Sequence, residues 1–148
     1  MQKSDQVFVQ ILKPGAALPL RASGAAAGYD LAAALDKIVI LPAGGRALVP
    51  TGIALELPMD MEAQVRSRSG LAWKHGISVL NSPGTIDSDY RGEVGVILQN
   101  HGAKDVAIEP GMRIAQLVFA RVAHPELIAS ASLGATERGD GGFGHSGE

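Results

Sequence analysis

Residues that could act on a ligand gather between positions 81 and 93, where the chain reads Asn-Ser-Pro-Gly-Thr-Ile-Asp-Ser-Asp-Tyr-Arg-Gly-Glu. Turn residues flank a short β-prone core at 85–87, a pattern that predicts a hairpin or tight loop between strands. Such a loop leaves backbone donors and acceptors free for a flat, hydrogen-bonding ligand, and Asp87 and Tyr90 lie within it. Because Asp and Gly are ordinary turn residues, the stretch by itself is more typical of a solvated surface turn.

A second candidate site precedes a short predicted helix. Ser69 is the expected N-cap, residues 71–75 form the helix, and Gly76 ends it. Free backbone N–H groups at the start of a helix bind anions, and the guanidinium of Arg66 or Arg68 can hold two phosphate oxygens at once. These features favour a polyphosphate ligand, and a plain cap with solvated arginines is the alternative.

The C-terminal residues 139–144 satisfy G-x-G-x-x-G. A dinucleotide-binding turn must follow a strand and open a helix, and no helix follows here, so we reject that interpretation. What remains is a flexible arm in which Phe143 could stack on a base while Arg138 meets phosphates. A disordered tail is the alternative.

Asp30 is a lone carboxylate among small apolar residues. It is either a turn-capping residue or, like Asp87, a candidate for magnesium organisation and water activation. Mg²⁺ usually keeps several waters and takes other ligands from substrate phosphates, so few protein ligands are expected.

Several classes of protein are disfavoured by what the sequence lacks. There is no cysteine, no Walker A or G-x-S-x-G sequence, and no paired histidine spacing for zinc. The formal net charge of −2 gives no basic field for nucleic acid. No apolar run reaches the length of a membrane span. We therefore expect a cytoplasmic protein without nucleic-acid or membrane partners.

The elements that must position these residues are mostly strands. Frequent glycine (19) and proline (8) suit many short strands joined by turns, and residues 61–66 alternate as a half-buried strand does. The chain therefore predicts an all-β sandwich, barrel or jelly roll: one domain over 1–136 and a Gly-rich arm over 137–148. The expected strands are residues 7–12, 29–31, 37–41, 46–56, 61–66, 77–80, 93–99, 106–109 and 114–122.

Five segments in order resemble the motifs of the trimeric dUTPase family. They read Ala-Gly-Tyr-Asp-Leu at 27–31, Arg-Ser-Gly-Leu-Ala at 68–72, the stretch at 81–93, Arg-Ile-Ala-Gln-Leu at 113–117 and Arg-Gly-Asp-Gly-Gly-Phe-Gly at 138–144. The departure is His145-Ser146, where many members have Ser-Thr, and it leaves the role of His145 open.

The resemblance implies a distorted jelly-roll subunit with one short helix, and a homotrimer whose three active sites each use motifs of all three chains. It also implies Mg²⁺-dependent hydrolysis of dUTP to dUMP and pyrophosphate, which limits uracil in DNA and supplies dUMP. The alternatives are a dCTP deaminase-like enzyme, for which we find no matching proton-shuttling Glu, and a non-catalytic nucleotide-binding protein on the same fold.

The resemblance also implies a role for each matching residue. Asp87 would be the general base, and Asp30 would hold magnesium-bound water. Asn81, Thr85 and Ile86 would bind uracil, and Tyr90 would pack under the deoxyribose. The phosphates would be bound by Arg68, Ser69, Gly70 and Gln116. The arm would add Arg138, Phe143 and Gly144. Asp89 and Arg91 would hold the loop in shape.

Overall fold

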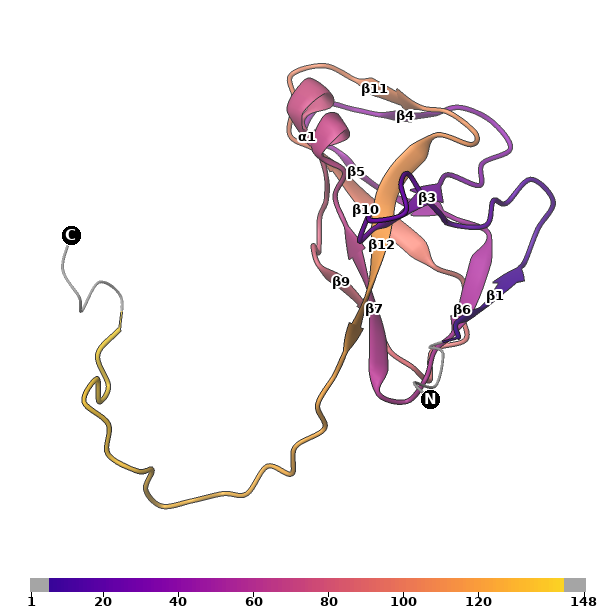
Figure 1. Cartoon of the computed structure of the whole chain (residues 1–148). Helices are drawn as coiled ribbons and strands as arrows, with labels where there is room; N and C mark the ends of the chain where they lie inside the picture. The colour runs from indigo at the N-terminus through magenta and orange to yellow at the C-terminus, as the bar shows by residue number, and fades with distance from the viewer. Residues whose placement is uncertain (1–5, 143–148) are drawn as a thin grey trace.

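The structure is a computed structural model that describes residues 6–142. It is all-β with one short helix, a distorted jelly roll in which every paired strand is antiparallel (Figure 1). Within the described residues no helix is long and apolar enough to cross a membrane. The fold class predicted from the sequence is thus confirmed.

The sheet that carries most of the predicted site has five strands in the order β2-β3-β12-β7-β9. Its central strand β12 pairs with β3 on one side, where Gln116 lies opposite Asp30, and with β7 on the other. The strands are β2 (Leu20–Arg21), β3 (Tyr29–Ala32), β7 (Met61–Arg66), β9 (Gly84–Ile86) and β12 (Arg113–Arg121).

Three smaller sheets complete the body. Their orders are β5-β10-β8, β1-β6 and β11-β4. The strands are β1 (Phe8–Ile11), β4 (Val39–Leu41), β5 (Arg46–Pro50), β6 (Ile53–Glu56), β8 (Ile77–Val79), β10 (Gly95–Asn100) and β11 (Val106–Ile108). Helix α1 (Ser69–His75) connects β7 to β8.

The core follows from the period-2 alternation of the strands. In β7 the side chains of Met61, Ala63 and Val65 are buried while those between them are not, as the sequence predicted. Aliphatic residues dominate the interior, and its largest fully buried side chains include Leu31, Leu98 and Leu117.

Two local predictions need correction, and a third is decided between its two alternatives. The expected strand 46–56 is two strands, because Gly52 takes a left-handed conformation (φ 68°) that turns the chain between β5 and β6. The N-cap of α1 is Arg68, not Ser69, because the Arg68 carbonyl already accepts the first helical hydrogen bond, from Ala72 N–H at 3.0 Å. For 81–93, predicted as a hairpin or a loop between strands, the structure excludes the hairpin: the stretch contains β9, which pairs with β7, whereas β10 pairs with β5 and β8.

The chain beyond β12 leaves the body. In Figure 1 it runs away from the sheets as an extended segment, and residues 123–140 are all exposed. Its last recorded hydrogen bond to the body joins His124 Nε2 and the Met59 carbonyl at 3.2 Å. The predicted boundary at residue 136 stays a prediction, and the packed body of this structure ends earlier.

Candidate functional site

Asp30 lies at the centre of a charged cluster at one end of the five-stranded sheet. Its Oδ1 accepts a hydrogen bond from Arg68 Nε and its Oδ2 accepts one from Arg113 Nη1, both at 3.0 Å. The Arg68 Nη1 also donates to the Arg113 carbonyl at 3.3 Å. The Asp30 side chain is only 19% exposed. Its two hydrogen bonds hold the guanidinium groups of Arg68 and Arg113 in place beside the start of α1.

Arg113 belongs to this cluster, although the sequence assigned it no role. In a regular strand, residues 113 and 116 would point to opposite faces. The register of β12 shifts between Arg113 and Ala115, and this irregularity puts Arg113 and Gln116 on the same side, since a bulge re-aims the side chains next to it. The sequence signal for Arg113 is its place at the start of the segment 113–117, three residues before Gln116.

Gln116 and Ser67 fix the segment that leads into α1. Gln116 Nε2 donates to the Ser67 carbonyl at 2.9 Å, and the Ser67 hydroxyl accepts a hydrogen bond from Val79 N at 2.8 Å. These bonds hold Ser67 against β12 and β8. They therefore fix the backbone position from which Arg68 and Ser69 follow. Ser67 was not among the predicted site residues.

Gly28 leaves the space that the Gln116 side chain occupies. A Cβ at position 28 would lie 2.1 Å from Gln116 Oε1 and 3.2 Å from Gln116 Cβ. We therefore expect Gly28→Ala to displace Gln116, break its bond to Ser67, and lower the free energy of unfolding by about 1–3 kcal/mol, the range for overpacking. Urea unfolding at a fixed protein concentration measures this.

Gly24→Ala is the matched control for this prediction, because a Cβ at position 24 has no atom within 4 Å. It should leave the unfolding midpoint nearly unchanged. Equal midpoints for the two variants would show that Gln116 moves aside at no cost.

Asp87 lies in a different place, at the end of β9. A pocket of about 210 Å³ is lined by seven residues that surround this position: Thr85, Ile86, Asp87, Tyr90, Glu93, Val94 and Gly95. Asp87 and Thr85 are exposed, whereas Ile86 is buried in the body and fixes the strand. Two of the three predicted base-reading residues, Thr85 and Ile86, therefore line the same pocket as Asp87, and Asn81 does not line it.

Two further residues shape this loop. Arg91 Nη1 donates to the Ser88 and Tyr90 carbonyls at 2.7 and 3.2 Å, which confirms its predicted role of holding the loop in shape. The side chain of Asn81 packs near Gly84, where a Cβ would come 3.2 Å from Asn81 Nδ2. Asn81 thus lies in the turn between β8 and β9, whereas the pocket residues lie in β9 and after it.

The structure keeps the two groups apart. The Asp30 cluster joins β3 and β12 to the start of α1, whereas the Asp87 pocket follows β9, the strand at the far edge of the sheet. Within residues 6–142 no recorded hydrogen bond or ion pair connects them. Arg138 contacts neither group, and its Nε donates to the nearby Gly141 carbonyl at 2.7 Å. Phe143, Gly144 and His145 lie outside the described residues.

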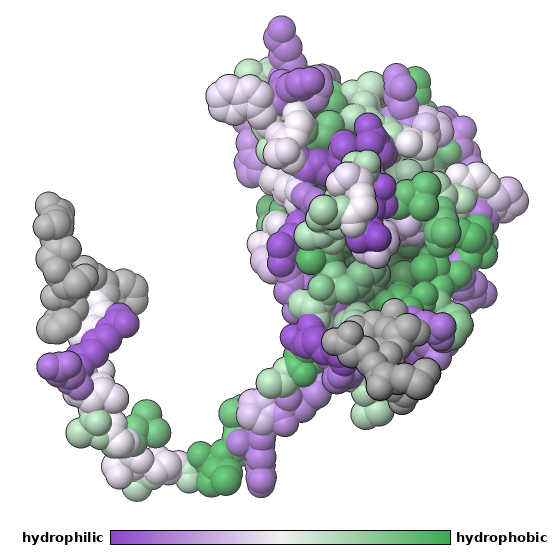
Figure 2. Space-filling view, viewed as in Figure 1, coloured by the Kyte–Doolittle hydropathy of each residue, from purple (hydrophilic) through white to green (hydrophobic). Residues whose placement is uncertain are grey.

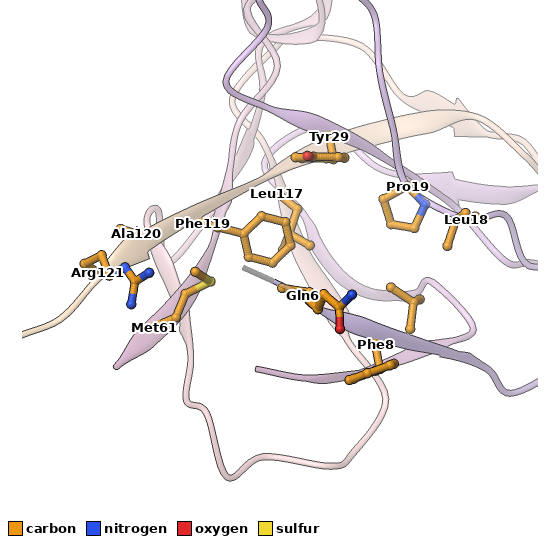
Figure 3. A pocket seen from close by; sticks show the side chains of 12 residues that line it. Gln6, Phe8, Leu18, Pro19, Tyr29, Met61, Leu117, Phe119, Ala120 and Arg121 are labelled. Carbon is orange, nitrogen blue, oxygen red and sulfur yellow. The ribbon is translucent and has the colours of Figure 1, made fainter. Parts of the chain in front are cut away.

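A larger groove, of about 740 Å³, contains none of the predicted site residues. Figure 3 shows its apolar lining, in which Tyr29 and Phe119 meet edge to face with ring centroids 5.5 Å apart. Figure 2 shows apolar side chains gathered over the part of the body where β1 and β6 lie. Phe8 and Leu18 contribute to this groove and remain 63% and 55% exposed.

The donor set around Asp30 suits magnesium only as an outer-sphere partner. Among residues 6–142 no three His, Asp or Glu side chains come together to form a metal cage. Both Asp30 oxygens accept one hydrogen bond each, and a carboxylate has about four acceptor positions, so capacity remains for metal-bound water. This fits an ion that relies on water and substrate phosphates for its ligands.

Comparison with known proteins identifies the family. The dUTPase family model matches residues 15–147. The chain belongs to the dUTPase family. The deoxyuridine 5'-triphosphate nucleotidohydrolase of Mesorhizobium japonicum is 56% identical over 135 residues, 90% of this chain and 84% of that protein. The protein of the same name from Syntrophotalea carbinolica is 50% identical over 145 residues, 98% of this chain and 99% of that protein.

Solved dUTPase structures have the same fold. A mutant dUTPase of Staphylococcus bacteriophage 80alpha, in complex with dUpNHpp, is 27% identical with a TM-score of 0.90, and the match covers 98% of this chain and 100% of that one. A dUTPase of S. aureus phage phi11, described with a structural Mg(II) ion, is 24% identical with a TM-score of 0.81 over 88% of this chain and 100% of that one. The second likeness concerns the fold alone.

Proposed function

We propose that this dUTPase-family protein hydrolyses dUTP to dUMP and pyrophosphate with Mg²⁺, and that it acts as a homotrimer. The observation that carries the proposal is the match of nearly the whole chain, at 50 to 56% identity, to proteins named for this reaction. The pocket that gathers Thr85, Asp87 and Tyr90 supports it.

In this proposal Asp87 is the general base. It is exposed at the pocket, where a water can reach both its carboxylate and a bound α-phosphate. The carboxylate takes a proton from the water as the water oxygen bonds to the α-phosphorus, and the bond from that phosphorus to the bridging oxygen breaks. Pyrophosphate leaves with that oxygen. No protein nucleophile is needed, because positioning and charge stabilisation lower the barrier.

The pocket residues, together with Asn81 from the turn before β9, would set specificity. Asn81 and the backbone near Thr85 and Ile86 read the uracil edge, and their close fit excludes the methyl group of thymine. Tyr90 packs under the deoxyribose and leaves no room for a 2′-hydroxyl. Both are rejections by steric misfit.

The phosphates would bind at the Asp30 cluster. Arg68 and the first residues of α1, Ser69 and Gly70, donate to phosphate oxygens, because the first N–H groups of a helix have no partner within it. Gln116 holds the Ser67 carbonyl that precedes them. Asp30 would hold Mg²⁺ through water, and the ion would neutralise phosphate charge.

The separation of the two residue groups supports a site shared between chains. One chain presents the phosphate cluster and the Asp87 pocket apart, so copies placed side by side could each complete the other's site. Exposed apolar side chains support association: Leu127 and Leu133 of the extended segment are 92% and 90% exposed. Arg138, Phe143 and Gly144 would then close over the ligand.

The most direct test is pyrophosphate release from dUTP, dCTP, dTTP and UTP side by side, with sedimentation to count chains. We expect rapid release from dUTP alone, and a trimer. Ammonia release from dCTP would indicate the deaminase alternative, and binding without release would indicate a non-catalytic protein. A cytoplasmic location without nucleic-acid or membrane partners stays a prediction from composition.

A further inference from the structure

The turn between β5 and β6 is fastened to the end of the Asp87 loop by four hydrogen bonds. Thr51 donates to the Val94 carbonyl through its hydroxyl at 2.5 Å and through its N–H at 3.2 Å. Val94 N–H donates to the Ile53 carbonyl at 2.8 Å. The fourth bond uses a side chain: Gly52 N–H donates to Glu93 Oε1 at 2.8 Å.

Gly52 is held in the conformation that aims its N–H at Glu93. Its φ is 68°, which disfavours any side chain, and a Cβ there would lie 2.6 Å from the Ala16 Cβ. Thr51 beside it is buried, with 2% exposure. The Gly52 N–H that donates to the Glu93 carboxylate therefore lies in a fixed turn between β5 and β6, 41 residues from Glu93 in sequence.

Glu93 in turn holds Tyr90. The Tyr90 hydroxyl donates to the Glu93 carbonyl at 3.0 Å. The ring also lies against the bare backbone of Gly92, where a Cβ would come 2.3 Å from the Tyr90 hydroxyl oxygen. Tyr90 is otherwise 45% exposed, so this bond and this contact are what orient its ring at the pocket.

We propose that Glu93 is a positioning residue for sugar discrimination: its carboxylate, anchored on Gly52 N–H, fixes the carbonyl that orients the Tyr90 ring. This inference rests on the proposed function, in which Tyr90 packs under the deoxyribose. If the anchor is lost, the peptide that carries the Glu93 carbonyl keeps the bond from Val94 N–H to the Ile53 carbonyl and can turn about it. The Tyr90 ring is then no longer held under the sugar, and a 2′-hydroxyl is admitted.

The experiment compares kcat/KM for dUTP with kcat/KM for UTP in the full-length protein. The ratio of the two values does not depend on the concentration of folded enzyme, so a loss of stability alone does not change it. We expect Glu93→Ala to lower the dUTP-to-UTP ratio about tenfold, the equivalent of one lost hydrogen bond. Tyr90→Phe, which removes the hydroxyl but keeps the ring, should lower the ratio in the same direction.

Glu93→Gln is the rescue variant, because its amide oxygen can still accept from Gly52 N–H, and it should keep the ratio within about twofold, well below the effect of a lost hydrogen bond. Glu109→Ala removes an exposed carboxylate on the loop after β11 and should leave the ratio unchanged. An unchanged ratio in Glu93→Ala or in Tyr90→Phe would overturn the inference, and so would an equal fall in Glu93→Gln.

Measurement of dUTP hydrolysis by the native protein distinguishes a failure of this inference from a failure of the proposed function. Failure to release pyrophosphate from dUTP would contradict the proposed function. Hydrolysis of dUTP with normal discrimination in every Glu93 variant would contradict only the role of Glu93.

Discussion

Asp87→Asn is expected to lower turnover of dUTP about a thousandfold while dUTP still binds. An amide has nearly the shape of the carboxylate but cannot accept the proton of the attacking water, and removal of a general base typically costs 10²- to 10⁴-fold. Asp87 is exposed at the mouth of its pocket, so the change should not disturb packing. Pyrophosphate release gives turnover, and calorimetry with the inactive variant gives the dissociation constant for dUTP.

Asp36→Asn is the matched control, since Asp36 is exposed on the loop between β3 and β4, outside both residue groups. It should keep native turnover. Turnover by Asp87→Asn at the native rate would contradict the base assignment. Loss of binding in proportion to turnover would instead make Asp87 a ligand-holding residue.

Removal of residues 137–148 is expected to leave a folded trimer whose activity is about 10²- to 10³-fold lower, the usual cost of losing a donor positioned on transition-state charge. Arg138 is the charged group in this segment that the proposal places on the phosphates. The fold should survive, because residues 123–140 are all exposed and their hydrogen bonds beyond His124 are local. Thermal unfolding, sedimentation and pyrophosphate release measure the three outcomes.

Arg138→Ala in the full chain measures the contribution of the guanidinium to activity apart from that of the rest of the arm. We expect it to account for part of the loss, with the remainder due to the residues that follow. Full activity in the truncated protein would show that the segment does not take part in the reaction.

Local patterns in the sequence determined the elements. Alternation of apolar and polar residues over 61–66 is a property of neighbouring positions, and β7 has it. The end of α1 was equally local: Gly76 adopts the left-handed conformation (φ 66°) and its N–H donates to the Ala72 carbonyl. The start of the same helix was predicted two residues late, at residue 71 instead of Ser69. It depends on the Arg68 carbonyl, and every residue has a carbonyl.

The order of the five segments also came from the sequence, and it was enough to indicate the family. Within each segment the residue types were visible, but their partners were not. The contacts of Ser67 and Glu93 were not predicted, because they are made with Val79 N–H and Gly52 N–H, and backbone donors carry no signature in a sequence.

Only the tertiary structure decided how the candidate site is divided. The bonds from Asp30 to Arg68 and Arg113 span 38 and 83 residues, and Arg113 reaches Asp30 because the register of β12 shifts next to it. Because β9 pairs with β7, it forms one edge of the five-stranded sheet, and Asp87 follows it there. Asp30 lies in β3, next to the opposite edge. Strand periodicity predicts which face a side chain takes, but strand order and irregularities in register come from long-range packing, which no local pattern contains.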